Sequence, residues 1–125
     1  MASMTLKGEI TWHGPDSTGP PGLLTLTVPK HGNITMVCTD LAYRVKWEGT
    51  LSRQGEHGLK GRVHTTDRSD EFWGWATVTG NLIGVSAPLW EFSGDWAEAH
   101  ATTDPSRSSG SDSAHWTFDA KLKED

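Results

Sequence analysis

The stretch LAYRVKWEGTL, residues 41–51, shows the clearest pattern in this chain of 125 residues. Every second residue from Leu41 to Leu51 is apolar, aromatic or glycine, and from Arg44 to Thr50 the residues between them are polar or charged. Successive side chains of an extended strand point to opposite faces, so the pattern predicts a strand with one buried face. Its recurrence along the chain decides the fold class.

Similar alternating segments fill most of the chain, separated by short stretches rich in glycine, proline and asparagine. They comprise residues 6–13, 24–28, 34–38, 59–64, 71–79, 89–96 and 115–122. The turn-forming residues Pro29–Asn33 predict a hairpin between two of these segments. Gly80-Asn81 predicts a further two-residue turn, because glycine admits the positive φ that such turns require.

Charge favours one particular register for the hairpin that follows the opening stretch. If a turn over residues 53–58 pairs Leu51 with Leu59, Glu48 lies opposite Arg62. Opposite charges directly across two strands contribute about 0.2–1 kcal/mol, so we expect this register.

The sequence therefore predicts an all-β fold, a single-domain antiparallel meander of eight to nine strands over residues 1–125. A meander of this length has to cover its edge strands, and we expect a small β-barrel rather than a β-sandwich. Residues 102–114 are rich in serine, threonine, aspartate and glycine, which predicts a mobile loop. The stretch 95–101 fits either continued strand or one short helical turn, since Asp95 and Glu98 resemble a capping box.

Composition narrows the classes of partner. The net charge is −5, and acidic residues are concentrated in the second half of the chain. This balance argues against nucleic acid as a partner, because phosphates attract basic surfaces. No apolar run is long enough for a membrane-spanning helix, and Met1–Gly8 contains no apolar signal segment, so we expect a soluble chain that is cytoplasmic or exported without a visible signal peptide. The single cysteine, Cys38, excludes an internal disulfide, and its apolar surroundings predict a core position.

Seven tryptophans are the unusual feature of so short a chain. Trp12, Trp47 and Trp116 fall on predicted inward faces, where burial in the core is the favoured interpretation. Trp73 and Trp75 share a face of a strand whose other face is also apolar. We interpret these two indoles as a stacking platform for a sugar ring or an apolar ligand, with edge packing or a dimer contact as the alternative.

A second pair of indoles, Trp90 and Trp96, shares a face of the next predicted strand, and Asp95 is a candidate for orienting a ligand beside them. If that strand continues, Glu98 and His100 join the face of Trp96 and become candidates for an acid/base pair or a shared metal. The favoured interpretation is a solvent-facing glutamate and histidine. The sequence contains no HExxH, G-x-S-x-G or phosphate-binding glycine motif, so we expect no metal site and no cofactor.

Three functional hypotheses follow. The leading one is a non-catalytic, lectin-like domain that binds a glycan or another small molecule on Trp73 and Trp75 or on Trp90 and Trp96, oriented by groups such as Asp95. The second is a β-barrel enzyme of cyclase or isomerase type that acts on a hydrophobic molecule in an interior cavity. The third is a protein-interaction or immunity domain. The sequence does not decide whether the chain forms a homodimer.

Overall fold

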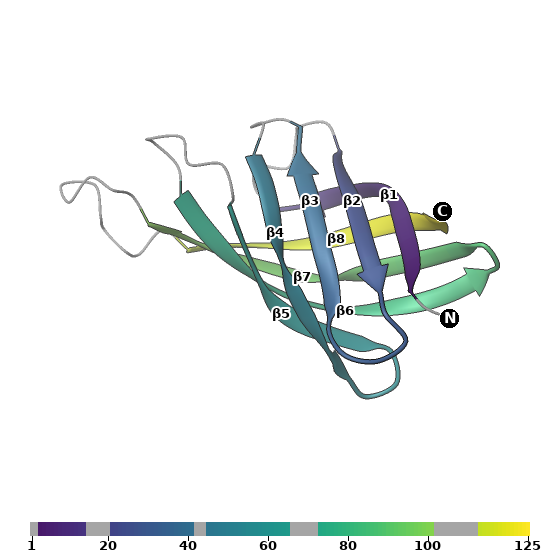
Figure 1. The fold of residues 1–125 in the computed structure, drawn as a ribbon. Helices are drawn as coiled ribbons and strands as arrows, with labels where there is room; N and C mark the ends of the chain where they lie inside the picture. Colours follow the sequence, from purple (N-terminus) through teal and green to yellow (C-terminus); the bar gives the residue numbers. More distant parts are fainter. Residues whose placement is uncertain (1–2, 15–20, 42–44, 66–72, 102–112) are drawn as a thin grey trace.

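Eight strands form one closed antiparallel barrel (Figure 1). The computed structural model of the protein describes residues 3–14, 21–41, 45–65, 73–101 and 113–125. The strands are β1 (Met4–His13), β2 (Gly22–Val28), β3 (Ile34–Asp40), β4 (Val45–Gln54), β5 (Gly58–Thr65), β6 (Trp73–Ser86), β7 (Leu89–Ala101) and β8 (Ser113–Glu124). Each strand pairs with the next in sequence, and β8 closes the barrel by pairing with β1. The predicted all-β meander and the choice of a barrel over a sandwich are confirmed.

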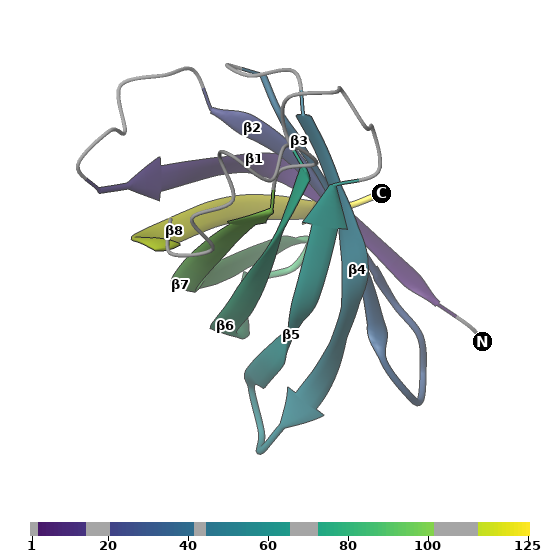
Figure 2. The same ribbon diagram turned by 90° about the vertical axis from the view of Figure 1, so that its left-hand side faces the viewer.

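The two ends of the barrel differ in their connections. Short turns at residues 29–33, 55–57 and 87–88 lie at one end, together with the start of β1 and the end of β8, and this end is termed the turn end. The opposite end, termed the loop end, contains the end of β1, the start of β2 and the matching ends of the other strands, and Figure 2 views the molecule from that side. The part of the chain that the structure describes contains no helix able to cross a membrane.

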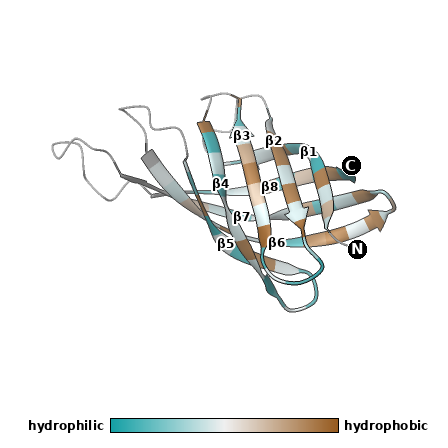
Figure 3. Cartoon of the chain, in the orientation of Figure 1, coloured by the Kyte–Doolittle hydropathy of each residue, from teal (hydrophilic) through white to brown (hydrophobic). Residues whose placement is uncertain are grey.

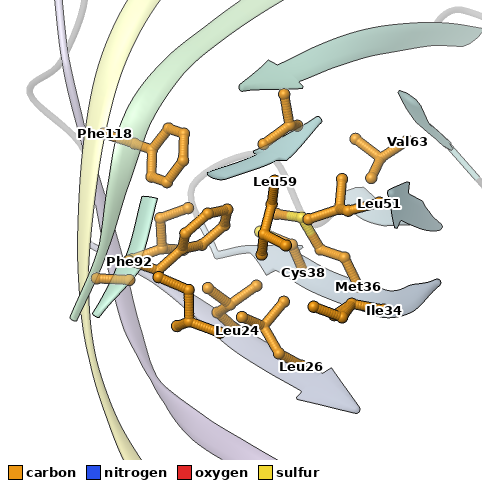
Figure 4. Close-up of a cluster of buried hydrophobic side chains, with 14 of the residues drawn as sticks. Leu24, Leu26, Ile34, Met36, Cys38, Leu51, Leu59, Val63, Phe92 and Phe118 are labelled. Carbon is orange, nitrogen blue, oxygen red and sulfur yellow. The ribbon is translucent and has the colours of Figure 1, made fainter. Parts of the chain in front are cut away.

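Alternate residues of every strand point into the barrel, as the sequence pattern predicts. Figure 3 shows apolar and polar residues alternating along the strands, and Figure 4 shows buried side chains of several strands meeting inside. The buried cluster comprises Leu6, Ile10, Leu24, Leu26, Ile34, Met36, Cys38, Trp47, Leu51, Leu59, Val63, Ala76, Val78, Leu82, Phe92, Trp96, Phe118, Ala120 and Leu122. Removal of this apolar surface from water is the main favourable contribution to folding.

The β4–β5 hairpin differs from the prediction in its register. Leu51 pairs with Gly61 rather than with Leu59, so Glu48 does not face Arg62. The turn is tighter than expected, because pairing continues to its edge and one turn glycine adopts a φ of 65°. Two residues separate the predicted and observed registers, and an even shift leaves every side chain on its predicted face.

The predicted turn at Gly80-Asn81 is wrong. β6 continues to Ser86, and the chain reverses at Ala87-Pro88. Around Gly80-Asn81, β6 pairs with β5 on one side and with β7 on the other, and these two ladders override the local turn preference. The reversal falls instead at proline, which has no amide donor to contribute to a ladder.

The stretch 95–101, for which sequence left two choices, is strand. β7 runs through it and pairs with β6 and β8, so the backbone hydrogen bonds are made across the sheet rather than within a helical turn. β8 begins at Ser113, so the last two residues of the predicted mobile loop 102–114 belong to a strand. Residues 102–112 lie outside the described residues.

Inward-facing glycines allow neighbouring strands to approach closely. A Cβ added at any of five such positions would lie 2.5 Å or less from a carbonyl oxygen of the adjacent strand. These positions are Gly8, Gly49, Gly61, Gly80 and Gly94. Strands bend sharply at such glycines, and a closed barrel requires that curvature.

We expect Gly94→Ala to lower the free energy of unfolding by about 1–3 kcal/mol, because the new methyl group would lie 2.0 Å from the Thr79 carbonyl oxygen. Urea unfolding followed by tryptophan fluorescence measures this difference. Gly84→Ala is the matched control, since its methyl group would meet nothing closer than 3.5 Å. Equal losses in the two variants would contradict this account of the barrel's curvature.

Cys38 lies in the core as predicted, with no measurable exposure. Burial raises the pKa of its thiol far above the usual value, and the neighbouring Asp40 carboxylate adds to the rise. The thiolate is the reactive form of cysteine.

We therefore expect Cys38 to react with a thiol reagent near neutral pH only when the barrel unfolds, with a rate that rises in step with the unfolded fraction in urea. Rapid labelling of the native chain would show that β3 is not enclosed.

Candidate functional site

Three indoles meet inside the barrel near the loop end. Trp12 lies near the end of β1, Trp47 near the start of β4 and Trp96 in the half of β7 that leads to the loop end. The ring of Trp96 makes edge-to-face contacts with the other two, at centroid distances of 5.5 Å to Trp12 and 5.2 Å to Trp47. Trp96 and Trp47 are almost completely buried, whereas Trp12 is half-buried. The cluster therefore consists of two buried indoles and one, Trp12, that is partly accessible to solvent.

Strand pairing explains why these side chains gather. Trp96 lies opposite Trp116 of β8, which is half-buried and also packs against the core. Trp12 lies opposite the inward-facing Phe118, and Trp47 lies opposite the buried Thr65. Inward-facing positions near one end of a narrow barrel have to share its interior. The sequence placed all four indoles on the inward face, and closure of the barrel brings them together.

A carboxylate extends this aromatic group toward the loop end. Glu98 follows Trp96 by two residues on the same face of β7 and is half-buried. The indole Nε1 of Trp96 donates a hydrogen bond of 2.8 Å to Oε1 of Glu98. This bond satisfies the buried indole and fixes the carboxylate at the inner surface of the barrel.

Trp12 carries a buried hydrogen-bond donor, the indole Nε1. Among the residues that the structure describes, this Nε1 has no hydrogen-bond partner. The benzene ring of this indole lies over Gly22, where an added Cβ would be 2.7 Å away. Glycine thus makes room for the benzene ring, and the donor is on the opposite, pyrrole side of the indole. An unpaired buried donor costs about 1–3 kcal/mol, which an acceptor atom of a ligand would recover.

Thr65 is the buried polar residue of β5 at the same end. Its hydroxyl accepts a hydrogen bond of 3.2 Å from the Gly74 amide and lies 3.4 Å from the Gly74 carbonyl oxygen, to which it donates. These contacts tie the end of β5 to the start of β6. Thr65 therefore stabilises the rim of the candidate site, and its hydroxyl is already engaged.

The residues predicted as ligand-binding do not form one surface. Trp96 lies inside near the loop end, whereas Trp90 lies inside near the turn end, where its Nε1 donates to Glu124 Oε2 at 3.2 Å. Trp75 faces outward and is half-buried. Asp95 is exposed on the outer face, where its Oδ1 lies 3.2 Å from Nε2 of His115. The side chain of Trp73 lies outside the described residues.

The two acid/base candidates are placed only in part. The backbone of His100 pairs with Gly74 in β6, but its side chain lies outside the described residues. Glu98 faces inward, as the continued strand predicts, and it bonds an indole rather than facing solvent. Within the described ranges no group of three or more histidine, cysteine or acidic side chains is arranged to hold a metal ion.

A shallow depression of about 340 Å³ marks the outer face of the barrel. It lies over β5, β6 and β7 and is lined by Gln54, Gly58, Leu59, Lys60, Thr79, Gly80, Asn81, Gly94 and Asp95. Asp95 is a predicted site residue that borders this hollow on the outer surface. The depression has no aromatic side chain, which separates it from the indole cluster inside.

Sequence reasoning assigned Trp12 and Trp47 to the core and did not identify the donor of Trp12 as unsatisfied. The inward face was visible from alternation, but whether an individual Nε1 finds an acceptor depends on atoms from several strands.

Comparison with known proteins gives no indication of the function, since no family model, curated protein or solved structure matches this chain.

We expect Glu98→Ala to lower the free energy of unfolding by about 1–3 kcal/mol, because it removes the acceptor of the buried Trp96 indole. Glu98→Gln keeps an amide oxygen at that position and is expected to cost distinctly less. Chemical denaturation of the two variants, monitored by circular dichroism, gives the comparison. Identical losses would mean that the hydrogen bond to Trp96 is not what Glu98 contributes.

Proposed function

We propose that this chain is a non-enzymatic binding domain that takes a carbohydrate at the loop end of the barrel. The observation that carries the proposal is the buried Nε1 of Trp12, which no described residue bonds, on an indole that contacts Trp96 of the Trp96–Glu98 pair. A ligand that accepts a hydrogen bond from Trp12 would satisfy a donor that the described part of the chain leaves buried and unbonded. Ligand binding and relief of that penalty would then be the same event.

The chemistry of the surrounding groups favours a sugar. The Trp12 indole donates, the Glu98 carboxylate accepts, and a sugar hydroxyl can do both. The half-buried indoles Trp12 and Trp116 offer apolar surface on which the C–H face of a sugar ring can pack. A purely apolar ligand would leave the Trp12 donor unpaired.

The described residues give less support to an enzyme. Hydrolysis of a glycosidic bond commonly uses two carboxyl groups about 5–9.5 Å apart across the bond. Glu98 is the inward-facing carboxylate of β7, whereas Glu91 and Asp95 of the same strand are exposed on the outer face. A cyclase or isomerase acting in the interior would need open space where the apolar cluster packs.

The leading test is a glycan-array screen followed by calorimetry with the best ligand. We expect Trp12→Phe to weaken binding about tenfold, because it removes one hydrogen-bond donor and keeps an aromatic ring. Trp75→Phe makes the same substitution on the outer face and is expected to leave affinity unchanged.

Two results would overturn the proposal in different ways. Absence of binding to any glycan would remove carbohydrate as the ligand class. Loss of binding in Trp75→Phe with full binding in Trp12→Phe would move the site to the outer platform that the sequence also suggested. Thermal melting of both variants checks that any loss of affinity is not loss of the fold.

A further inference from the structure

One strand of the barrel has an unpaired edge. The last β5 residue paired with β6 is Gly58, which lies opposite Asn81. One further bond, from the Leu82 amide to the His57 carbonyl at 2.9 Å, follows on that side. From Ile83 to Ser86, β6 has β7 on one side and no paired strand on the other within the described residues. In Figure 1 the β6–β7 hairpin extends at the turn end, where this edge lies.

The side chains along this edge are apolar and exposed. Ile83 is 47 % exposed and Val85 is 58 % exposed, and the nearby Leu89 of β7 is 49 % exposed. No charged residue occurs from Leu82 to Trp90. Proteins usually protect exposed strand edges with charges, because such edges pair readily with other strands. The segment is therefore built like a pairing surface rather than like ordinary solvent-facing strand.

We propose that the free edge of β6, Leu82–Ser86, pairs antiparallel with the same edge of a second copy of this chain. The inference is independent of the carbohydrate proposal, because it concerns the turn end and uses none of the loop-end residues. Two identical edges related by a two-fold axis satisfy one another's backbone groups, as an isologous interface requires.

The alternation of the strand defines the register. The Leu82 amide points toward the β5 side, so the amide and carbonyl of Gly84 point to the same free edge. A two-fold axis at Gly84 then places Ile83 opposite Val85 of the second copy, as a pair whose side chains lie close together. Gly84 adds no side chain at the axis, and the three atoms nearest to a methyl group there, at 3.5–3.7 Å, all belong to Trp90.

Charge favours a second copy over an anionic membrane surface as the occupant. The edge itself carries no charge, so two copies meet without like-charge repulsion. Next to the apolar residues, Glu91 and Lys121 lie in one cross-strand row and Lys123 lies opposite Leu89. Charges of both signs suit a protein rim, whereas the net charge of −5 opposes binding to anionic headgroups.

The contact is short, which limits its strength. A standard stable interface buries about 1,600 Å², far more than a single edge of this length provides. The bulge in the β6–β7 ladder between Gly84 and Ser86 lies within the proposed paired segment and increases the local twist there, which limits the contact to the residues around Gly84. The expected dimer is therefore reversible and dependent on concentration.

Sedimentation velocity over a concentration series tests the association. The unmodified chain is expected to show a sedimentation coefficient that rises with concentration, and the double variant Ile83→Lys with Val85→Lys is expected to stay monomeric throughout. The double variant Leu23→Lys with Leu41→Lys adds the same charge at exposed leucines elsewhere and is expected to keep the rise. A monomeric unmodified chain, or a rise lost in the leucine variant and kept in the β6 variant, would overturn the proposal.

Disulfide trapping tests the register and stays informative if the lysine variant fails to fold. Ile83→Cys and Val85→Cys variants with different mass tags are oxidised separately and as a mixture. Because Ile83 is placed opposite Val85 of the second copy, the mixed product is expected to exceed either same-variant product several-fold. Equal yields of all three products, or no cross-linking, would overturn the register. The native Cys38 is buried and serves as an internal control.

Discussion

Pairing of β1 with β8 closes the barrel, and both the buried core and the indole cluster require that closure. This ladder runs from Leu6 opposite Glu124 to His13 opposite Thr117 and joins the two ends of the described chain. Without it, β1 and β8 would be free edges and the inward faces of eight strands would form an open, half-exposed surface. With this ladder, every inward-facing residue contributes to one interior. Glycines such as Gly8, which lies against the β8 backbone, let neighbouring strands approach closely enough for the barrel to close.

Closure also determines how deeply each tryptophan is buried. Trp96 is fully buried, whereas Trp12, on the strand that closes the barrel, is half-buried and holds a donor that no described residue bonds. The carboxylate of Glu98 lies on the inner wall because β7 keeps its alternation beyond Trp96. A binding site at this end needs no specialised loop to supply these three groups, since the barrel wall positions them. At the turn end, β6 extends beyond its pairing with β5 and leaves an exposed apolar edge.

The fold could be predicted from sequence because period-two alternation reports which face of a strand is buried, and closure follows from the number of strands and their short connections. Residues whose role depends on a face alone, such as Cys38 and Trp47, were placed correctly. Features that depend on competition between strands were not predicted. The Gly80-Asn81 turn yields to two flanking ladders, and charge at Glu48 does not determine the register of its hairpin. The candidate site was harder still, because the satisfaction of the Trp12 donor and the separation of Trp90 from Trp96 depend on the whole barrel.

Nuclear Overhauser contacts across the β1–β8 seam show whether the barrel is closed in solution. We expect backbone contacts between Gly8 and Leu122 together with contacts between the indole protons of Trp12 and Trp96. Strong β6–β7 contacts without any contact across the seam would contradict closure, because the sheet would then be open and the indole cluster would not exist.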